Sequence, residues 1–140
     1  VGTGETWTRN SVSMGDGIYK STDGGQNWKN MGLPKSDRIA SIVIDPKNSD
    51  VVWVAVLGAL WGDSDERGIY KTTDGGTTWN KVLFVDNKTG CSDLIMDPHF
   101  GNSEEQVGHS AQEELNRLCI KQPMAEKLGT KFTTVSLLDN

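Results

Sequence analysis

Long apolar runs and basic clusters are both missing from this chain of 140 residues. The longest apolar stretch runs from Val51 to Trp61 and is interrupted by Gly58, whereas a membrane-spanning helix needs about 20 consecutive apolar residues. No Lys/Arg cluster exceeds two neighbours, and the formal net charge is −5. Because affinity for nucleic acid depends on neutralising phosphates, we expect neither a membrane span nor a nucleic-acid partner.

Cysteine is scarce as well, with two residues in the whole chain. Cys91 and Cys119 could form a disulfide or could both be free thiols, so they do not indicate a cellular compartment. Together with the two histidines, they lack the close paired spacing of zinc sites. Segment 63–68 begins like a calcium-binding loop, but Arg67 stands where an oxygen ligand belongs. We therefore expect no metal and no cofactor.

The chain does contain an internal repeat. Residues 21–28 (STDGGQNW) return 51 positions later as residues 72–79 (TTDGGTTW), and Gly-Ile-Tyr-Lys precedes both copies. Each copy predicts a β-hairpin with an Asp-Gly-Gly turn, whose glycines can adopt a positive φ and whose aspartate accepts hydrogen bonds from its own turn. The tryptophan is expected to lie across the hairpin and to bury roughly 150–250 Å². We expect structural roles for Ser21, Asp23, Gly25, Trp28, Thr72, Asp74, Gly76 and Trp79.

The pattern Ser/Thr-x-Asp-x-Gly-x-x-Trp resembles the Asp box, or BNR repeat, of the sialidase-type and sortilin-type β-propellers. With Gly-Ile-Tyr-Lys in front of it, the pattern most resembles the Asp-box glycosyl hydrolase-type proteins of bacteria. The resemblance covers residues 1–98 only, and it implies an all-β propeller built from four-stranded blades. It also implies a secreted or periplasmic protein, although no signal peptide is recognisable in this chain.

Within this pattern, the repeat unit is predicted to contain four strands. The complete blade spans residues 39–84, with strands at Ile39–Ile44, Val51–Leu57, Gly68–Thr72 and Thr78–Phe84. An incomplete blade precedes it at 1–38, and a third begins at 91–98. Since a propeller of four to eight blades needs about 160–400 residues, we expect a fragment of a longer protein.

The last 42 positions, residues 99–140, do not continue the repeat. Ser110 and Glu113 can form a capping box, and Ala111, Leu115, Leu118 and Cys119 fall on one helical face. A tail of unrelated, partly helical character is therefore expected.

Four loops are predicted to share the end opposite the Asp-box turns: 5–16, 31–38, 58–67 and 85–90. The ligand candidates on this face are Trp7, Arg9, Arg38, Trp61, Glu66 and Arg67. Indoles beside charged groups suit a sugar or a peptide, so the first hypothesis is a module that binds protein or glycan there. The alternative is a solvated loop face with ordinary charges.

Catalysis is the second hypothesis. A glycosidase needs two carboxylates roughly 5–9.5 Å apart, and the candidates by position are Glu5, Asp16, Asp63 and Asp65. The arginine triad, the Tyr–Glu pair and the Arg-x-Pro entry of sialidases cannot be matched. We therefore expect no complete catalytic site here, and in this alternative the chain is part of a glycoside hydrolase whose catalytic residues lie partly outside it. A fragment without autonomous function is the third hypothesis.

The strand predicted at Val51–Leu57 is nearly all apolar, as expected when both of its faces are covered. With one complete blade, at least one face is expected to stay uncovered, so we predict that the isolated chain self-associates.

Overall fold

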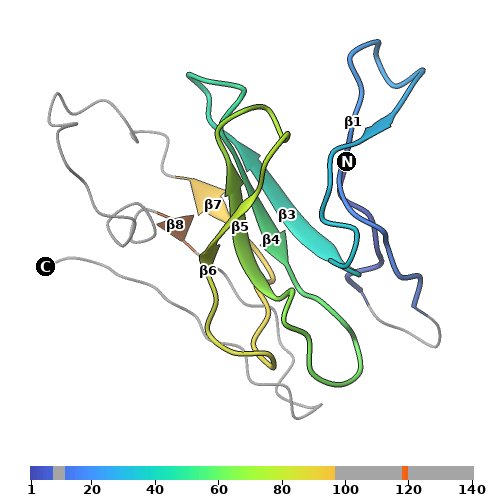
Figure 1. Cartoon of the computed structure of the whole chain (residues 1–140), viewed down its shortest axis with the longest axis vertical. Coiled ribbons are helices and arrows are strands. Elements are labelled where there is room, and N and C mark those ends of the chain that lie inside the picture. Colours follow the sequence, from blue (N-terminus) through green and yellow to red (C-terminus); the bar gives the residue numbers. More distant parts are fainter. Residues whose placement is uncertain (8–11, 97–117, 120–140) are drawn as a thin grey trace, which may run out of the picture.

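The computed structural model describes residues 1–7, 12–96 and 118–119. This part of the chain is all-β, with antiparallel sheets and no helix. Figure 1 shows three layers, with the first hairpin on one side of a four-stranded sheet and a short two-stranded sheet on the other. The described part of the chain contains no helix with the length and hydrophobicity that crossing a bilayer requires.

The central sheet is an antiparallel meander in the order β3-β4-β5-β6. Its strands are β3 (Ile39–Ile44), β4 (Val52–Val56), β5 (Gly68–Thr72) and β6 (Asn80–Leu83). The predictions for β3 and β5 are confirmed, whereas the other two strands are shorter than predicted. Strand β6 starts late because Thr78 still belongs to the turn, where its backbone N–H and its hydroxyl both donate to Asp74.

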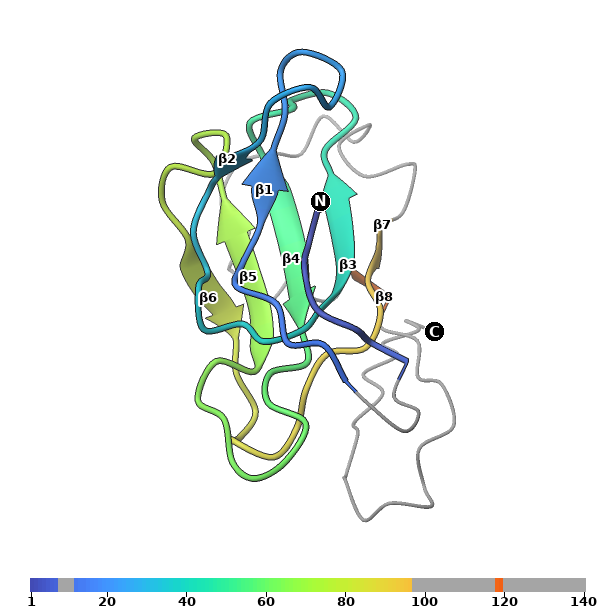
Figure 2. The same ribbon diagram turned by 90° about the vertical axis from the view of Figure 1, so that its right-hand side faces the viewer.

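The first hairpin pairs β1 (Tyr19–Lys20) with β2 (Lys29–Asn30). The N-terminal residues add a third, irregular strand, because Gly2 bridges to Ile18 and the backbones of Val1 and Tyr19 exchange two hydrogen bonds. This segment corresponds to β4, and Figure 2 shows it beside β1. The first repeat therefore has counterparts of β4, β5 and β6, but no described counterpart of β3.

Strand β4 forms the middle of the core. Trp53 and Ala55 pack on one face with Cys91 and Leu94, while the opposite face packs in a second cluster that contains Ile18 of the first repeat. The prediction that one face of this strand stays uncovered is wrong, because segment 91–94 lies across it without forming a ladder. At about 25 cal/mol per Å² of apolar surface, this double burial makes β4 the strongest hydrophobic anchor of the sheet.

The same glycine position bends both repeats. Gly17 and Gly68 each have a φ of 126°, and a Cβ on either would collide with a backbone carbonyl of the paired strand, that of Gly32 or Leu83 respectively. Only glycine fits this close approach. The register shift between Ile69 and Tyr70 follows directly, so both hairpins start with the same irregularity.

Beyond the central sheet, β7 (Ile95–Met96) pairs with β8 (Leu118–Cys119). The strand predicted over 91–98 is thus confined to two residues among those described, since Asp93 turns its carboxylate onto the Leu94 N–H instead of extending the chain. The helix predicted around Ala111–Gln122 lies outside the described residues except at β8. There the two described residues, Leu118 and Cys119, form a short strand.

Candidate binding site at the loop end

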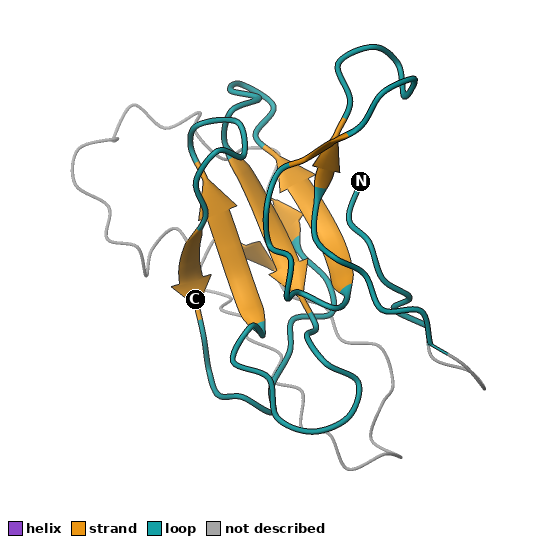
Figure 3. Ribbon diagram, turned by 45° about the vertical axis from the view of Figure 1, so that its right-hand side comes forward, coloured by secondary structure: helices purple, strands orange, loops and turns teal. Residues whose placement is uncertain are grey.

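The two ends of the sheets differ in kind. The two Asp-Gly-Gly turns lie at one end, and the long loops gather at the other (Figures 1 and 3). Backbone hydrogen bonds tie these loops together: Gly15 N–H donates to Asp37 at 2.6 Å, and Ser64 N–H donates to Asn87 at 2.8 Å. The loops predicted to share one end therefore do so.

The two repeated segments, 21–28 and 72–79, are called boxes below, and they have the same internal geometry. In the second box, Thr72 donates its hydroxyl to Asp74 Oδ1 at 2.7 Å and accepts the N–H of Gly76 at 3.0 Å. The same carboxylate oxygen accepts the N–H of Thr77 and of Thr78, each at 2.9 Å. In the first box, Ser21, Asp23, Gly25 and Asn27 repeat most of these contacts. Each carboxylate thus satisfies the donors of its own turn.

These hydrogen bonds perturb both carboxylates. The backbone and side chain of Asn27, followed by the Ser21 hydroxyl, lower the pKa of Asp23 to about 2. The side-chain and backbone donors of Thr78, with the Thr72 hydroxyl, hold the pKa of Asp74 far below its usual range. Both carboxylates are therefore ionised at neutral pH and committed to the turn.

The two box tryptophans differ. Trp79 donates its indole N–H to the Met31 carbonyl at 2.7 Å and packs on the first repeat. Trp28 has half of its surface exposed, at 50%, so the predicted burial across its own hairpin is wrong for this residue. Trp79 is covered by the preceding repeat, and none of the described residues covers Trp28 in this way.

Two of the three arginines predicted for the ligand face, Arg38 and Arg67, are buried within the loop end. Arg67 donates from Nη1 to the Leu57 carbonyl at 2.6 Å, and its other donors reach the carbonyls of Ala59, Gly62 and Asn87. Burial lowers the pKa of this guanidinium group. A buried cation with four carbonyl contacts fixes the path of loop 58–67.

Arg38 supports the same loop from the neighbouring connection. Its Nε donates to the Gly58 carbonyl at 2.9 Å and its Nη2 to that of Ala59 at 3.2 Å. Burial, and then the nearby charge of Arg67, lower its pKa. The adjoining loop also holds Leu33 and Asp37 at positive φ, a backbone conformation that side chains other than glycine rarely adopt.

Two indoles stand exposed on these loops. Trp7 and Trp61 are 80% and 81% exposed. The neighbouring Glu66 accepts the Tyr70 hydroxyl at 2.9 Å, and together with burial this contact raises the pKa of that phenol. Arg9 lies outside the described residues.

The four candidate carboxylates are distributed over the loops, and three of them accept hydrogen bonds through their carboxylate groups. Glu5 accepts from the Ser13 N–H at 3.3 Å, Asp16 from the Tyr19 hydroxyl at 2.8 Å, and Asp63 from the Asn87 amide at 3.2 Å. The backbone carbonyl of Asp65 accepts from Lys81. Within residues 1–7, 12–96 and 118–119, no group of three His, Cys, Asp or Glu side chains could hold a metal ion.

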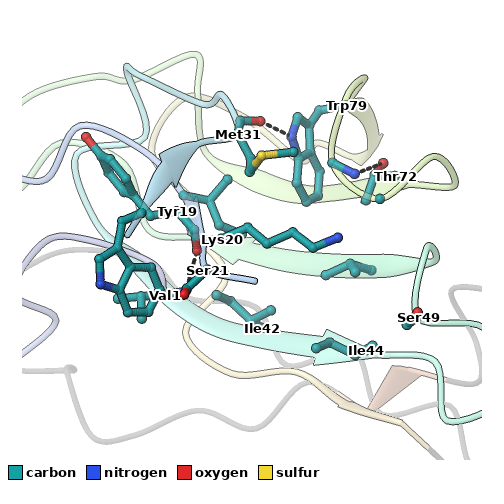
Figure 4. Close-up of a pocket in the computed structure, with 15 residues that line it drawn as sticks. Val1, Tyr19, Lys20, Ser21, Met31, Ile42, Ile44, Ser49, Thr72 and Trp79 are labelled. Atoms are coloured by element: carbon teal, nitrogen blue, oxygen red, sulfur yellow. Dashed lines mark hydrogen bonds between the residues drawn. The ribbon is translucent and has the colours of Figure 1, made fainter. Parts of the chain in front are cut away.

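A cavity of about 340 Å³ opens between the first hairpin and strands β3 and β4 (Figure 4). Its walls are largely apolar and include Ile18, Ile42, Ile44 and Val52. Neither Asp nor Glu lines it, so the cavity lacks the pair of carboxylates that glycoside hydrolysis needs. It lies away from the exposed indoles of the loop end, and we do not assign the binding site to it.

The roles of Arg38 and Arg67 are the main feature that sequence reasoning missed. From sequence, an arginine in a polar loop is predicted to be exposed, because arginine is rarely fully buried without partners. The partners here are backbone carbonyls, which residue types do not identify. A usable signal was the position of Arg67 directly before Gly68, where the chain leaves the loop and enters β5.

The described structure is thus an all-β protein with two tandem Asp-Gly-Gly hairpins and one loop-rich end. No protein-family model matches the chain, and no solved structure matches it. Two curated sequences from Acetivibrio thermocellus, both named xyloglucanase Xgh74A, are 29% identical to it over 102 residues. This match covers 65% of the chain but 11% of each relative, so the chain spans a small part of the xyloglucanases it resembles.

Proposed function

We propose that this chain is a repeat module of an Asp-box β-propeller and that its loop end binds carbohydrate, with a xyloglucan-type β-glucan as the ligand class. The observation that carries the proposal is the exposure of Trp61 on a loop held by buried Arg67. An indole at a water-facing position has a large apolar face free for stacking. A sugar ring presents the complementary flat C–H surface.

Rigidity of the loop supports this assignment. Arg67 fixes the carbonyls on both sides of Trp61, those of Ala59 and Gly62, at 2.8 Å and 3.1 Å from Nη2. A binding loop that is already ordered loses less conformational entropy when the ligand arrives. The indole is therefore presented from a fixed backbone.

The similarity to xyloglucanases supports the choice of ligand. Those relatives carry an activity on xyloglucan in their name, and the Asp-box resemblance points independently to proteins of carbohydrate metabolism. A protein ligand on the same face is the other form of the binding hypothesis. It becomes the favoured form if carbohydrate binding fails in the experiment below.

The test is a titration of the folded chain with xyloglucan oligosaccharides by isothermal calorimetry. Trp61→Ala should weaken binding at least tenfold, and Trp7→Ala should weaken it if both indoles contact the ligand. Trp28→Ala is the matched control, because this indole is also exposed but belongs to the opposite end of the sheets. Unchanged binding in Trp61→Ala, with a wild-type melting transition, would overturn the proposal.

A second candidate function is part of a glycoside hydrolase. It is favoured by the name of the matched relatives and by the acidic side chains of the loop end, notably Asp63 and Asp65. Incubating the chain with xyloglucan and measuring new reducing ends separates the two. Binding without hydrolysis supports the module, whereas hydrolysis that Asp63→Asn or Asp65→Asn abolishes supports the enzyme.

A further inference from the structure

Each repeat presents one exposed indole from the same loop. Loop 5–16 precedes the Gly-Ile-Tyr-Lys strand of the first repeat and contains Trp7, while loop 58–67 precedes that of the second repeat and contains Trp61. These indoles are 80% and 81% exposed. In Figure 1 both loops leave the sheets at the end opposite the Asp-Gly-Gly turns. A surface that recurs once per repeat suits a ligand that is itself built from repeating units.

Segment 36–38 holds the two loops together. On the side of the second loop, Arg38 donates from Nη2 to the Ala59 carbonyl at 3.2 Å. On the side of the first loop, the Asp37 carbonyl accepts the Gly15 N–H at 2.6 Å. This segment therefore lies between the two loops that carry the exposed indoles.

Short stretches of chain separate each indole from this segment. Gly4 lies so close that an added Cβ would collide with the Asp37 carbonyl, and Trp7 follows three residues later. Trp61 follows Ala59 by two residues. At no more than about 3.6 Å per residue, the Cα of Trp7 lies within about 11 Å of that of Gly4, and the Cα of Trp61 within about 7 Å of that of Ala59. A ligand of a few sugar rings that crosses segment 36–38 can therefore reach both indoles.

The Asp37 carboxylate is a free acceptor at this crossing. Its side chain is half-buried, and none of the described residues donates a hydrogen bond to the carboxylate. The backbone of Asp37 has a φ of 54°, a conformation that persists where the surrounding structure fixes it. A carboxylate accepts several hydrogen bonds, and sugar hydroxyls supply the donors. The fixed backbone and the unpaired oxygens suit a residue that orients a sugar between the indoles.

We propose that a glycan chain crosses the boundary between the two repeats, with one sugar ring on Trp61, another on Trp7, and Asp37 accepting hydroxyl hydrogen bonds between them. This inference rests on the proposed function and adds to it a minimum length of the ligand. Trp61, on the loop fixed by Arg67, is the first contact and Trp7 the second. Once the first ring is bound, the second contact is intramolecular, so a longer chain gains affinity.

The experiment is a calorimetric titration of the folded chain with xyloglucan oligosaccharides of one and of two repeating units. The two-unit oligosaccharide should bind at least tenfold more tightly than the single unit. Trp7→Ala should reduce the affinity for two units to about that for one. Trp28→Ala, at the opposite end of the sheets, is the control and should keep the full difference between the two lengths.

Asp37→Asn tests the path of the ligand across segment 36–38. Asparagine adopts a positive φ as aspartate does, so the substitution removes the charge and keeps the backbone. The affinity for two units should fall at least fivefold while the thermal melt stays that of wild type. Asp45→Asn is the matched control, because Asp45 follows β3 at the opposite end of the sheet, and its affinity should equal that of wild type.

The outcomes separate this inference from the proposed function. Equal affinities for the two lengths in wild type, or two-unit binding that Trp7→Ala or Asp37→Asn leaves unchanged, would overturn the crossing. Trp61→Ala would still weaken binding in that case if the proposed function holds. Failure of the folded wild-type chain to bind either oligosaccharide would contradict both.

Discussion

Replacing Arg67 by methionine should lower the free energy of unfolding, because Arg67 holds the loops of the loop end together. We expect this loss of stability and not a direct loss of contacts with the ligand. Methionine keeps most of the apolar stem but removes every donor. Four hydrogen bonds disappear, to the carbonyls of Leu57, Ala59, Gly62 and Asn87. The free-energy cost of losing each hydrogen bond differs, because the four carbonyl acceptors differ in burial.

The Leu57 carbonyl contributes most to the expected loss. It belongs to a buried residue, and a buried acceptor without a partner costs about 1–3 kcal/mol. The Ala59 carbonyl keeps a donor, Arg38 Nη2. The Asn87 carbonyl likewise keeps a donor, the Ser64 N–H. The Gly62 carbonyl lies near the surface and can turn to water, at about 0.5–1 kcal/mol. We therefore expect Arg67→Met to lower the free energy of unfolding by about 2–4 kcal/mol.

Urea denaturation followed by tryptophan fluorescence measures this loss. With a slope of about 2 kcal/mol per molar urea, in the middle of the range for small proteins, the midpoint should fall by about 1–2 M. Lys35→Met is the matched control, because Lys35 is an exposed cation of the same loop end, and its midpoint should stay near that of wild type. An unchanged midpoint in Arg67→Met, together with lost oligosaccharide binding, would refute the structural role of Arg67. It would show that Arg67 contacts the ligand, as the sequence predicted.

Two further predictions concern the turns. The folded-state pKa of Asp23 is lowered to about 2 and that of Asp74 still further. The stability that these carboxylates contribute is therefore complete above about pH 4, the unfolded value, and is lost as the pH falls through the folded-state values. Asp74→Asn should flatten this acid limb in a plot of unfolding free energy against pH, and an unaltered limb would contradict the assignment. Gly68→Ala should prevent cooperative folding because its Cβ meets the Leu83 carbonyl, whereas Gly24→Ala, with no atom near its Cβ position, should cost about 1 kcal/mol in thermal melts.

Sequence alone predicted the hairpins well because their determinants are local. An Asp-Gly-Gly turn with Ser or Thr two residues before the aspartate contains its own donors and acceptors, so Asp23 and Asp74 could be placed without any tertiary information. The strands Ile39–Ile44 and Gly68–Thr72 follow from β-branched and aromatic residues between turn signals. The ends of the neighbouring strands were misplaced where a side chain competes with the ladder, as Thr78 does.

The parts that escaped prediction depend on contacts distant in sequence. Trp28 and Trp79 are identical in local pattern, yet one is half exposed and the other is hydrogen-bonded to a residue 48 positions away. In the same way, the burial of Arg67 depends on carbonyls from two separate segments, 57–62 and the loop that contains Asn87. Periodicity and turn signals contain no information about such partners, so the candidate site could be located at the loop end but its structural residues could not be separated from its ligand residues.

The most direct test of the central claim uses the indole N–H signals in a proton–nitrogen correlation spectrum. The chain contains five tryptophans, and substitution of each by phenylalanine assigns its signal. During titration with xyloglucan oligosaccharides, the signals of Trp61 and Trp7 should shift, while those of Trp28 and Trp79 at the Asp-box end should stay in place. Shifts of Trp28 or Trp79 with Trp61 unmoved would contradict the account and place the ligand at the opposite end of the sheets.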